Sequence, residues 1–451
     1  TWNSKSSIPH EYSNFTSADP SLVFDDNGYI FVSYIDFDKN KDSGSVFVRK
    51  STDGGLNWSN STKVIDYFSD SGKKPIDRPW IAVDRSGSTT NGNLYITTMS
   101  IKGAKSPFHP YFIKSTDANA SWSSWRYLDT TNWLAGNIIP QPMPSPAVSP
   151  DGTFHAIYPS YKSSQDPKPQ YIHASSSNAG KSIQHNTVFK TTNAVDDSLI
   201  KGGQLLIADP SDASHLAFIY LLNRNGDADV YLRESNDGGT TWPNEWRVND
   251  DPISNDRMQD LVWGDFDSDG DLAITWRDRR NASDSGYQTK HEIMGAMKWK
   301  DSSSISPNFK VTDSIIEYDP ILDKAGNDFM SVQLENDTMS AVWGDPRSGS
   351  LDIWFHRMDV RNGNTVNISL LNHKPENGFT IYPNPATSYL KIKGEHIDRV
   401  AVFDQKGKKV LEKSASVKNK TKIRTKELPS GIYFAKIKSN KRFIIEKFIK
   451  E

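Results

Sequence analysis

Arginine–aspartate pairs are the residues of this chain whose types and spacing best suit ligand binding. Asp77-Arg78 and Asp256-Arg257 each stand where a short apolar strand is expected to begin. Two further arginines, Arg280 and Arg347, close matching stretches of the form Trp-x-Asp-x-Arg. Guanidinium groups bind planar anions such as carboxylate or sulfate through paired hydrogen bonds. The pattern indicates an anion-binding group; the alternative is that each pair ties neighbouring elements together.

A second group of carboxylates lies in the run Asp265-Phe266-Asp267-Ser268-Asp269-Gly270-Asp271. Asp265, Asp267 and Asp269 have the alternate spacing of a calcium loop, and Gly270 allows the turn. The closing carboxylate of such a loop is missing, because Ala273 and Trp276 occupy the later ligand positions. A structural Ca²⁺ and a solvated acidic turn are therefore both open, and the sequence predicts no required cofactor.

Composition excludes several other kinds of chemistry. The chain has no Cys, which removes disulfides, thiol catalysis and zinc–thiolate sites. No phosphate-binding glycine loop, Ser–His–Asp arrangement or His-rich metal site stands out. No run approaches the roughly 18 apolar residues of a membrane helix. The chain begins at Thr1 in mid-pattern, as we expect of a processed mature form.

The elements that must position the candidate residues are short strands in a repeated unit. The unit closes with a polar turn, intact in Ser51-Thr52-Asp53-Gly54-Gly55-Leu56-Asn57-Trp58 and in Ser235-Asn236-Asp237-Gly238-Gly239-Thr240-Thr241-Trp242. Worn copies begin at Ser115 and Ser176, which gives a period of roughly 60 residues. Openings of the unit recur near Asp19, Arg78, Ser145, Gln204, Arg257 and Asp328. We therefore expect an all-β, six-bladed β-propeller over residues 1–371, with a seventh blade only if residues 300–325 contain further strands.

The turn Ser-x-Asp-Gly-Gly-x-x-Trp resembles the Asp-box of the sialidase (BNR-repeat) superfamily, whose fold is a six-bladed propeller. Asp-boxes are structural. Their hydroxyl and carboxylate accept hydrogen bonds from backbone N–H groups, their glycines allow positive φ, and the Trp packs beneath. The resemblance assigns this role to Ser51, Asp53, Gly55, Trp58, Ser235, Asp237, Gly239 and Trp242.

In a propeller the innermost strands begin at one mouth of the central channel, and the loops between second and third strands overhang it. We therefore expect Asp77-Arg78 and Asp256-Arg257 at the same position of two opposite blades, with Arg280 and Arg347 above them. The sialidase resemblance implies a general acid in the first overhanging loop, where Asp42 stands. It also implies a Tyr–Glu nucleophile pair, for which Tyr287 and Glu292 are the candidates.

The first-blade arginine of sialidases is replaced here by Ala18. Each charge-assisted hydrogen bond lost in this way is worth about 1.5–3 kcal/mol, so strict exo-sialidase activity is disfavoured. Two functions remain: a propeller that binds and hydrolyses a glycan at its mouth, and a non-catalytic surface propeller that binds glycan or protein. Whether the chain is an enzyme stays open at this point.

The last part of the chain has a different charge. Residues 372–451 hold 19 Lys and Arg against 8 Asp and Glu, a net charge of +11, whereas residues 1–371 carry −13. Such an asymmetry indicates two units with different partners. The basic residues alternate with apolar strand residues and show no nucleic-acid motif, so a nucleic-acid partner is not expected. Short runs separated by Gly, Pro and Lys turns predict a small, Ig-like antiparallel sandwich.

The order of motifs in this segment is specific. Tyr382-Pro383-Asn384-Pro385-Ala386-Thr387-Ser388 is followed by Val400-Ala401-Val402-Phe403-Asp404, then Leu428-Pro429-Ser430-Gly431-Ile432-Tyr433-Phe434, then Lys447-Phe448-Ile449-Lys450. This order is similar to the type A sorting domain of type IX secretion cargo. The resemblance implies recognition by the outer-membrane translocon and its shuttle protein, and delivery to the cell surface or the medium.

Overall fold

The computed structural model describes residues 7–40, 42–137, 139, 142–162, 166–191, 203–324, 329–361, 366–367, 380–404, 408–439 and 442–450. The chain divides into two compact units, Trp2–Ile368 and Ser369–Glu451. The predicted boundary between residues 371 and 372 lies outside the described residues, as does the predicted strand opening at Asp328.

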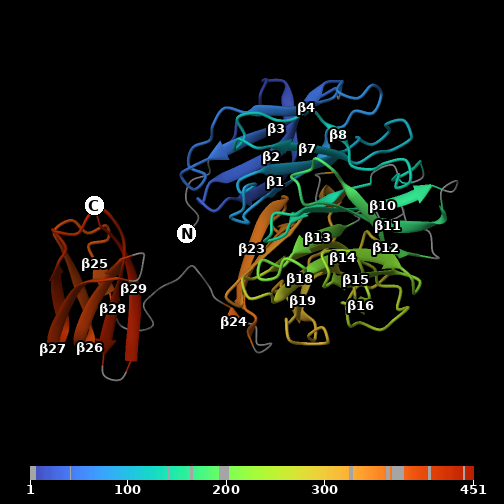
Figure 1. Cartoon of the computed structure of the whole chain (residues 1–451). Helices are drawn as coiled ribbons and strands as arrows, with labels where there is room; N and C mark the ends of the chain where they lie inside the picture. Colours follow the sequence, from blue (N-terminus) through green and yellow to red (C-terminus); the bar gives the residue numbers. More distant parts are fainter. Residues whose placement is uncertain are drawn as a thin grey trace. The chain divides into compact units, whose positions relative to one another are not determined.

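The first unit consists of six four-stranded antiparallel sheets that follow one another in chain order (Figure 1). Sheets 1 to 3 contain β1 (Phe15–Phe24), β2 (Ile30–Asp38), β3 (Gly44–Ser51), β4 (Thr62–Asp66), β5 (Asp77–Val83), β6 (Leu94–Met99), β7 (Tyr111–Ser115), β8 (Arg126–Tyr127), β9 (Ser145–Val148), β10 (Phe154–Lys162), β11 (Asp166–Ser176) and β12 (Gln184–Lys190). Sheets 4 to 6 contain β13 (Gln204–Ala208), β14 (Leu216–Asn223), β15 (Ala228–Ser235), β16 (Asn244–Arg247), β17 (Gln259–Phe266), β18 (Leu272–Asp278), β19 (Glu292–Lys298), β20 (Phe309–Lys310), β21 (Ser331–Glu335), β22 (Thr338–Asp345), β23 (Asp352–Asp359) and β24 (Val366–Asn367). Between sheets 5 and 6 the chain forms a single helical turn, α1 (Ile321–Lys324).

Consecutive sheets pack face to face through apolar cores. The first strand of each sheet contacts the first strand of the next, from β1 through β21. In β18, Trp276 packs toward sheet 4, while Ala273 of the same strand packs toward sheet 6. This follows from the alternation of side chains along a strand, which supplies apolar residues to both faces of a middle sheet.

The strand registers define two sides of the first unit. Phe15 of β1 pairs with Asp38 of β2, and Phe37 pairs with Gly44 of β3, so first-strand starts and second-to-third loops share one side. We call this the mouth side. The closing turns, which join third and fourth strands, lie at the other ends of the strands, on what we call the Asp-box side.

The two intact closing turns have the same hydrogen bonds. Gly55 N–H donates to Ser51 Oγ at 2.9 Å, and Asn57 N–H donates to Asp53 Oδ1 at 2.9 Å. In the second copy, Gly239 N–H donates to Ser235 Oγ at 2.8 Å and Thr241 N–H to Asp237 Oδ1 at 2.8 Å. All four turn glycines, Gly54, Gly55, Gly238 and Gly239, have positive φ. Trp242 is buried, whereas Trp58 is partly exposed beside Gly55.

The second unit is one five-stranded antiparallel sheet of β25 (Thr380–Tyr382), β26 (Tyr389–Asp404), β27 (Lys409–Arg424), β28 (Gly431–Ser439) and β29 (Arg442–Lys450). The long strand β26 pairs with β25 through its first half and with β28 through its second half. Leu390 and Val402, from these two halves, share one apolar core. A single coiled sheet therefore encloses the core of this unit.

Candidate functional site

Three first strands carry a β-bulge at the same register on the mouth side. The bulges lie between Ala18 and Ser21, between Asp77 and Trp80, and between Asp260 and Trp263. The bulged residues Asp19, Arg78 and Leu261 have φ values of 53°, 47° and 55°. Positive φ is uncommon in residues other than glycine, and a bulge redirects the side chains around it. The bulges thus aim a selected set of side chains inward from sheets 1, 2 and 5.

This register corrects one sequence-based expectation. Asp256-Arg257 was expected to match Asp77-Arg78, but the residue equivalent to Asp77 is Asp260, and Leu261 takes the place of Arg78. Asp256 and Arg257 precede β17; Asp256 is exposed, and the Arg257 guanidinium donates to the Asp256 carbonyl at 2.9 Å. In sheet 1, Ala18 occupies the position equivalent to Asp77.

A carboxyl pair lies beside Arg78. Asp77 and Asp19 share a hydrogen bond between their carboxyl groups, and burial together with the Asp19 charge raises the pKa of Asp77 to about 7. The backbone N–H of Arg78 donates to Asp19 Oδ2 at 3.4 Å, and its guanidinium lies 5.3 Å from the centre of the Phe329 ring. Two carboxylates this close repel each other when both are ionised, so the pair holds one proton near neutral pH. The group can donate and accept hydrogen bonds and present a cation at the same place.

Aromatic rings fill the space between sheets 2 and 5. The rings of Trp80 and Trp263 lie 5.3 Å apart, and Trp80 meets Phe329 edge-on at 5.5 Å. Trp80 and Trp263 come from the first strands of sheets that are three apart in chain order. These apolar surfaces form a floor beside the carboxyl pair and Arg78.

A second charged group on the mouth side is fully buried. Arg277 donates to both oxygens of Asp260, at 2.7 Å from Nε and 2.5 Å from Nη2, and Arg279 Nη1 donates at 3.0 Å. The two arginines are 1% and 2% exposed, and their charges hold the pKa of Asp260 far below its usual range despite burial. Burial lowers the pKa of nearby His291 to about 3, and the two arginines add to this, so the imidazole is neutral. The group is inaccessible, and its geometry is that of a core ion network.

The structure separates the two residues expected to form a nucleophile pair. Tyr287 accepts a hydrogen bond from Arg277 Nη2 at 3.2 Å, and burial raises the pKa of its hydroxyl. Glu292 instead accepts from Asn281 at 2.5 Å and pairs with Lys310 at 2.6 Å. Glu292 stands opposite Asp278 in the sheet, next to Arg277 in sequence, so Tyr287 and Glu292 serve opposite faces. Asp42 lies exposed in the loop between β2 and β3, on the mouth side as expected.

Arg280 and Arg347 occupy equivalent positions and tie neighbouring sheets together. Arg280 pairs with Asp278 at 2.9 Å and with Asp250, in the connection from sheet 4, at 2.6 Å. Arg347 pairs with Asp345 at 2.7 Å and with Asp313, in the connection from sheet 5, at 2.6 Å. In both cases the Trp of the stretch donates its indole N–H to the same aspartate. The structure therefore agrees with the alternative interpretation for these two arginines.

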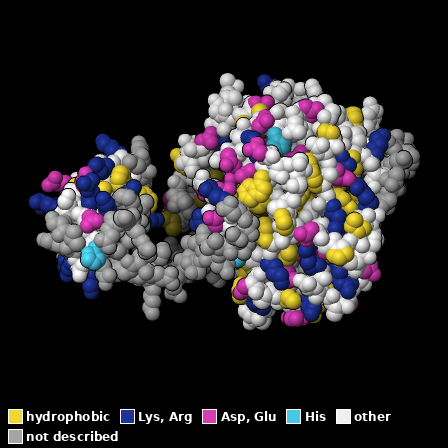
Figure 2. All heavy atoms as spheres, turned by 90° about the horizontal axis from the view of Figure 1, so that it is seen from below, with side chains coloured by type: hydrophobic (Ala, Val, Ile, Leu, Met, Phe, Trp, Pro, Cys, Tyr) yellow, Lys and Arg dark blue, Asp and Glu magenta, His cyan; other side chains and the backbone are white. Residues whose placement is uncertain are grey.

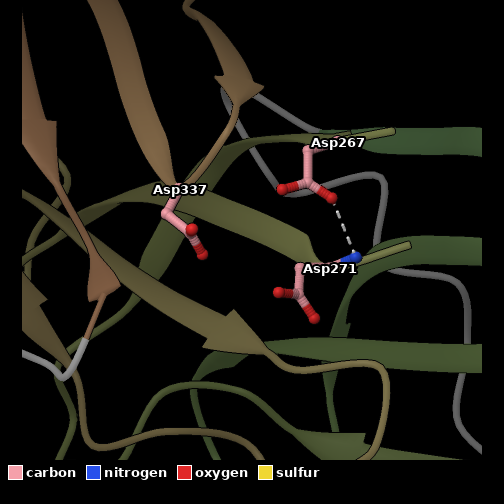
Figure 3. Close-up of side chains that lie close together, drawn as sticks. All are labelled: Asp267, Asp271 and Asp337. Carbon is pink, nitrogen blue, oxygen red and sulfur yellow. Dashed lines mark hydrogen bonds between the residues drawn. The ribbon is translucent and has the colours of Figure 1, made fainter. Parts of the chain in front are cut away.

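The carboxylates of the acidic run do not gather as the calcium spacing predicts. Asp265 accepts the backbone N–H of Leu334 at 2.9 Å, and Asp269 is exposed. Asp267 and Asp271 approach Asp337, from the turn between β21 and β22, with one oxygen of each within 4.8 Å of the others. Figure 3 shows the three side chains converging from two sheets, with Asp271 N–H donating to Asp267.

This acidic group offers three of the six to eight oxygen ligands that Ca²⁺ takes. Burial raises the pKa of Asp267 to about 6, and Asp337 also pairs with the guanidinium of Arg361. The residues fit a cation whose remaining ligands are waters, with Arg361 as the competing positive charge.

A cavity of about 780 Å³ lies on the Asp-box side between sheets 4 and 5. His215 lines it and bridges two buried carboxylates, Asp209 at 2.9 Å and Glu234 at 3.2 Å. Burial opposes the imidazolium, but its bonds to the two carboxylates outweigh this and raise the pKa of His215 to about 9. Lys298 completes the network at 3.8 Å from Glu234 and donates to the Ser302 carbonyl at 2.5 Å. The buried charges in this wall already satisfy one another, which indicates a structural junction.

Sequence reasoning identified Asp77 and Arg78 but did not show which residues meet in the buried network around Asp260 or in the acidic group. Arg277 and Arg279 alternate with Asp278 and Arg280 along the chain. Because successive side chains of a strand point to opposite faces, this alternation could have placed Arg277 and Arg279 on the face opposite to Asp278 and Arg280. Asp337 is separated from Asp267 by more than one repeat, and no local pattern links the two.

One family model matches the chain: residues 380–451 match the secretion system C-terminal sorting domain. The second unit is therefore a type IX sorting domain, and the protein is exported across the outer membrane to the cell surface or extracellular space. No helix among the described residues is long and apolar enough to cross a membrane.

No curated protein matches the chain, but solved structures resemble about three quarters of it. A protein of unknown function from Dyadobacter fermentans is 14% identical with a TM-score of 0.48, covering 77% of this chain and 96% of its own. An α-L-arabinofuranosidase of Fusarium graminearum bound to arabinobiose is 14% identical with a TM-score of 0.49, covering 77% and 95%. The intramolecular trans-sialidase from Ruminococcus gnavus, in complex with oseltamivir carboxylate, is 12% identical with a TM-score of 0.46, covering 78% and 96%. These identities are too low to transfer an activity to this chain.

Proposed function

We propose that the exported protein is a six-bladed β-propeller that binds an acidic glycan on its mouth side, followed by an Ig-like sorting domain. Six consecutive four-stranded sheets with neighbouring first strands support the propeller, as does the meeting of Trp80 and Trp263 from sheets three apart. The single coiled core of the second unit supports the Ig-like comparison.

The observation that carries the binding proposal is the hydrogen-bonded pair Asp19–Asp77 beside Arg78. Carboxyl groups bind sugar hydroxyls as donors or acceptors, and a guanidinium binds a carboxylate or sulfate through paired hydrogen bonds. Phe329 and Trp80 add apolar surface against which the C–H face of a sugar ring packs. A uronate or sulfated sugar matches all three properties.

Non-catalytic binding is the better supported form of this function. The nucleophile pair expected from the sialidase resemblance is not assembled, because Tyr287 and Glu292 bond to different partners. Hydrolysis is a second candidate, favoured by one observation: Asp77 with a pKa of about 7 is suited to act as a general acid. In that reaction Asp77 would protonate the glycosidic oxygen. Asp19, hydrogen-bonded to Asp77, is too close to be the second carboxylate, which lies roughly 5 Å or more from the acid in glycosidases, so another group would have to activate the attacking water.

The test is a screen of the full chain against neutral, uronate-bearing, sulfated and sialylated oligosaccharides, each also offered as a chromogenic glycoside. Binding restricted to acidic sugars, with no turnover, is the expected result. Turnover that disappears in Asp77→Asn, while Asp42→Asn remains active, would establish the hydrolytic form. Binding that survives both Arg78→Ala and Asp77→Asn would overturn the mouth-side assignment.

A further inference from the structure

Four lysines of the sorting domain stand in directly opposed pairs. In the antiparallel ladder between β26 and β27, Lys391 faces Lys422, and Lys393 faces Lys420. Residues that alternate with them, including Leu390, Ile392 and Ile423, are buried, so the four lysines project from the outer face of the sheet. Like charges directly opposite one another destabilise a sheet. The arrangement is thus unfavourable for the isolated fold.

Two tyrosines contact three of these lysines, Lys391, Lys420 and Lys422. The ammonium of Lys422 lies 3.7 Å from the centre of the Tyr389 ring, and that of Lys391 lies 5.2 Å from the same ring. Tyr382, 37% exposed, has Lys391 and Lys420 at 5.7 Å and 6.0 Å from its ring. Cation–π contacts orient the amino groups without neutralising their charge. We call Tyr382, Tyr389, Lys391, Lys393, Lys420 and Lys422 the lysine face.

Acidic residues of the domain pair elsewhere. Glu412 bonds to Arg399 and Lys409, and Glu427 lies 3.9 Å from Arg424, the basic neighbour at the edge of the face. Within the described part of the domain, no carboxylate forms an ion pair with the four lysines. Basic side chains are correspondingly prominent on the visible surface of the sorting domain in Figure 2.

We propose that the lysine face is the surface by which the sorting domain docks onto an acidic protein surface of the outer-membrane export machinery. A regular sheet presents the four ammonium groups at fixed spacing, and ordered charges of this kind steer and orient association with an oppositely charged surface. Docking also removes the like-charge repulsion that the free domain retains. The inference rests on the sorting domain and is independent of the proposed glycan binding.

The test compares two full-length variants in cells that carry a type IX secretion system. One removes the face in a quadruple Lys→Gln variant at positions 391, 393, 420 and 422. The matched control removes four exposed charges elsewhere in the same domain, by Lys→Gln at positions 409, 426, 438 and 447. We expect the first variant to accumulate in the periplasm, with surface or secreted protein reduced at least fivefold, and the control to be exported normally.

The melting temperature of the face variant distinguishes a loss of docking from a failure to fold. The face variant loses two like-charge pairs and also the cation–π contacts to Tyr382 and Tyr389, so these effects oppose one another and the melting temperature of its sorting domain should change little. A quadruple Lys→Arg variant, which keeps the charges, should be exported. Normal export of the face variant, or equal loss in the control, would overturn the proposal. The alternative partner, an anionic polysaccharide, is tested with heparin. If the face variant loses heparin binding but is still exported normally, the proposed docking onto the export machinery is overturned.

Discussion

At the scale of single residues, burial decides what the charged side chains of the mouth side can do. Asp77 and Arg78 could be singled out from sequence because they open a strand. Their partner Asp19 is brought to them by bulges in two different strands, and bulge positions leave no clear mark in the sequence. For the same reason the match to Asp256-Arg257 failed. A spacing of residues does not show where a strand gains an extra residue.

The raised pKa of Asp77 gives a stability prediction. An acid whose pKa is higher in the folded than in the unfolded state contributes stability below pH 4, and this is lost as the pH rises through about 7. Asp77→Asn should therefore raise the free energy of unfolding by about 1–3 kcal/mol at pH 8 and change it little at pH 4. Urea unfolding at the two pH values measures this, with the exposed Asp42→Asn as control. A destabilised variant at pH 8 would contradict the shared-proton account.

His215 gives a pH dependence in the same direction, but at higher pH. Its folded pKa of about 9 lies above the ordinary value, so the bridge between Asp209 and Glu234 is fully present below about pH 6.5 and lost as the pH rises through 9. Wild-type stability should fall by on the order of 2 kcal/mol between pH 7 and 9.5 relative to His215→Gln, whose profile should be flatter. Parallel profiles for the two proteins would show that the bridge contributes nothing. Lys298 and the Phe266 ring are the other groups facing this site.

At the scale of elements, local patterns were predictive and pairings between sheets were not. The closing turns could be assigned because all their hydrogen bonds lie within a few residues. The calcium-loop spacing predicted the wrong set of carboxylates. Asp337 joins the group from the next sheet, whereas Asp265 accepts a hydrogen bond from Leu334 of that sheet. For Arg280 and Arg347, the repeated Trp-x-Asp-x-Arg stretch predicted equivalent roles, but only the structure shows Asp250 and Asp313 as their partners.

The sheet-tying role of Arg280 is testable. Arg280→Ala leaves the buried carboxylate of Asp278 without its cation and breaks the link to Asp250. The free energy of unfolding should fall by about 2–4 kcal/mol, whereas Lys63→Ala, which removes the exposed pair with Asp66, should cost less than about 1 kcal/mol. Glycan affinity should be unchanged in Arg280→Ala at a temperature where it is folded. A loss of glycan affinity in folded Arg280→Ala would instead show that Arg280 belongs to the ligand site.

The Asp267–Asp271–Asp337 group predicts stabilisation by a divalent cation. Ca²⁺ that binds only the folded state should raise the melting temperature with rising concentration. Asp337→Asn should abolish this increase, and Asp269→Asn, at an exposed position of the same turn, should leave it intact. An unchanged melting temperature of the wild type up to millimolar Ca²⁺ would favour the solvated acidic turn.

At the scale of the whole molecule, the chain joins two units with separate cores and opposite charge. The repeat predicted the six four-stranded sheets, and the motif order predicted the sorting domain, because both signals extend over many residues. The ligand site depends on which few side chains meet between sheets, so its composition could be only partly predicted. Export and ligand binding thus reside in different units and can be tested independently.

The central claim is that Asp19, Asp77 and Arg78 together bind an acidic glycan. Calorimetric titration of the full chain with the best acidic oligosaccharide tests it directly, in wild type, Arg78→Ala and Arg257→Ala. Both arginines are partly exposed on the mouth side, but only Arg78 stands beside the carboxyl pair. We predict that Arg78→Ala weakens binding at least tenfold, equivalent to about 1.4 kcal/mol, and that Arg257→Ala changes it less than twofold. Equal affinities in wild type and Arg78→Ala would contradict the account.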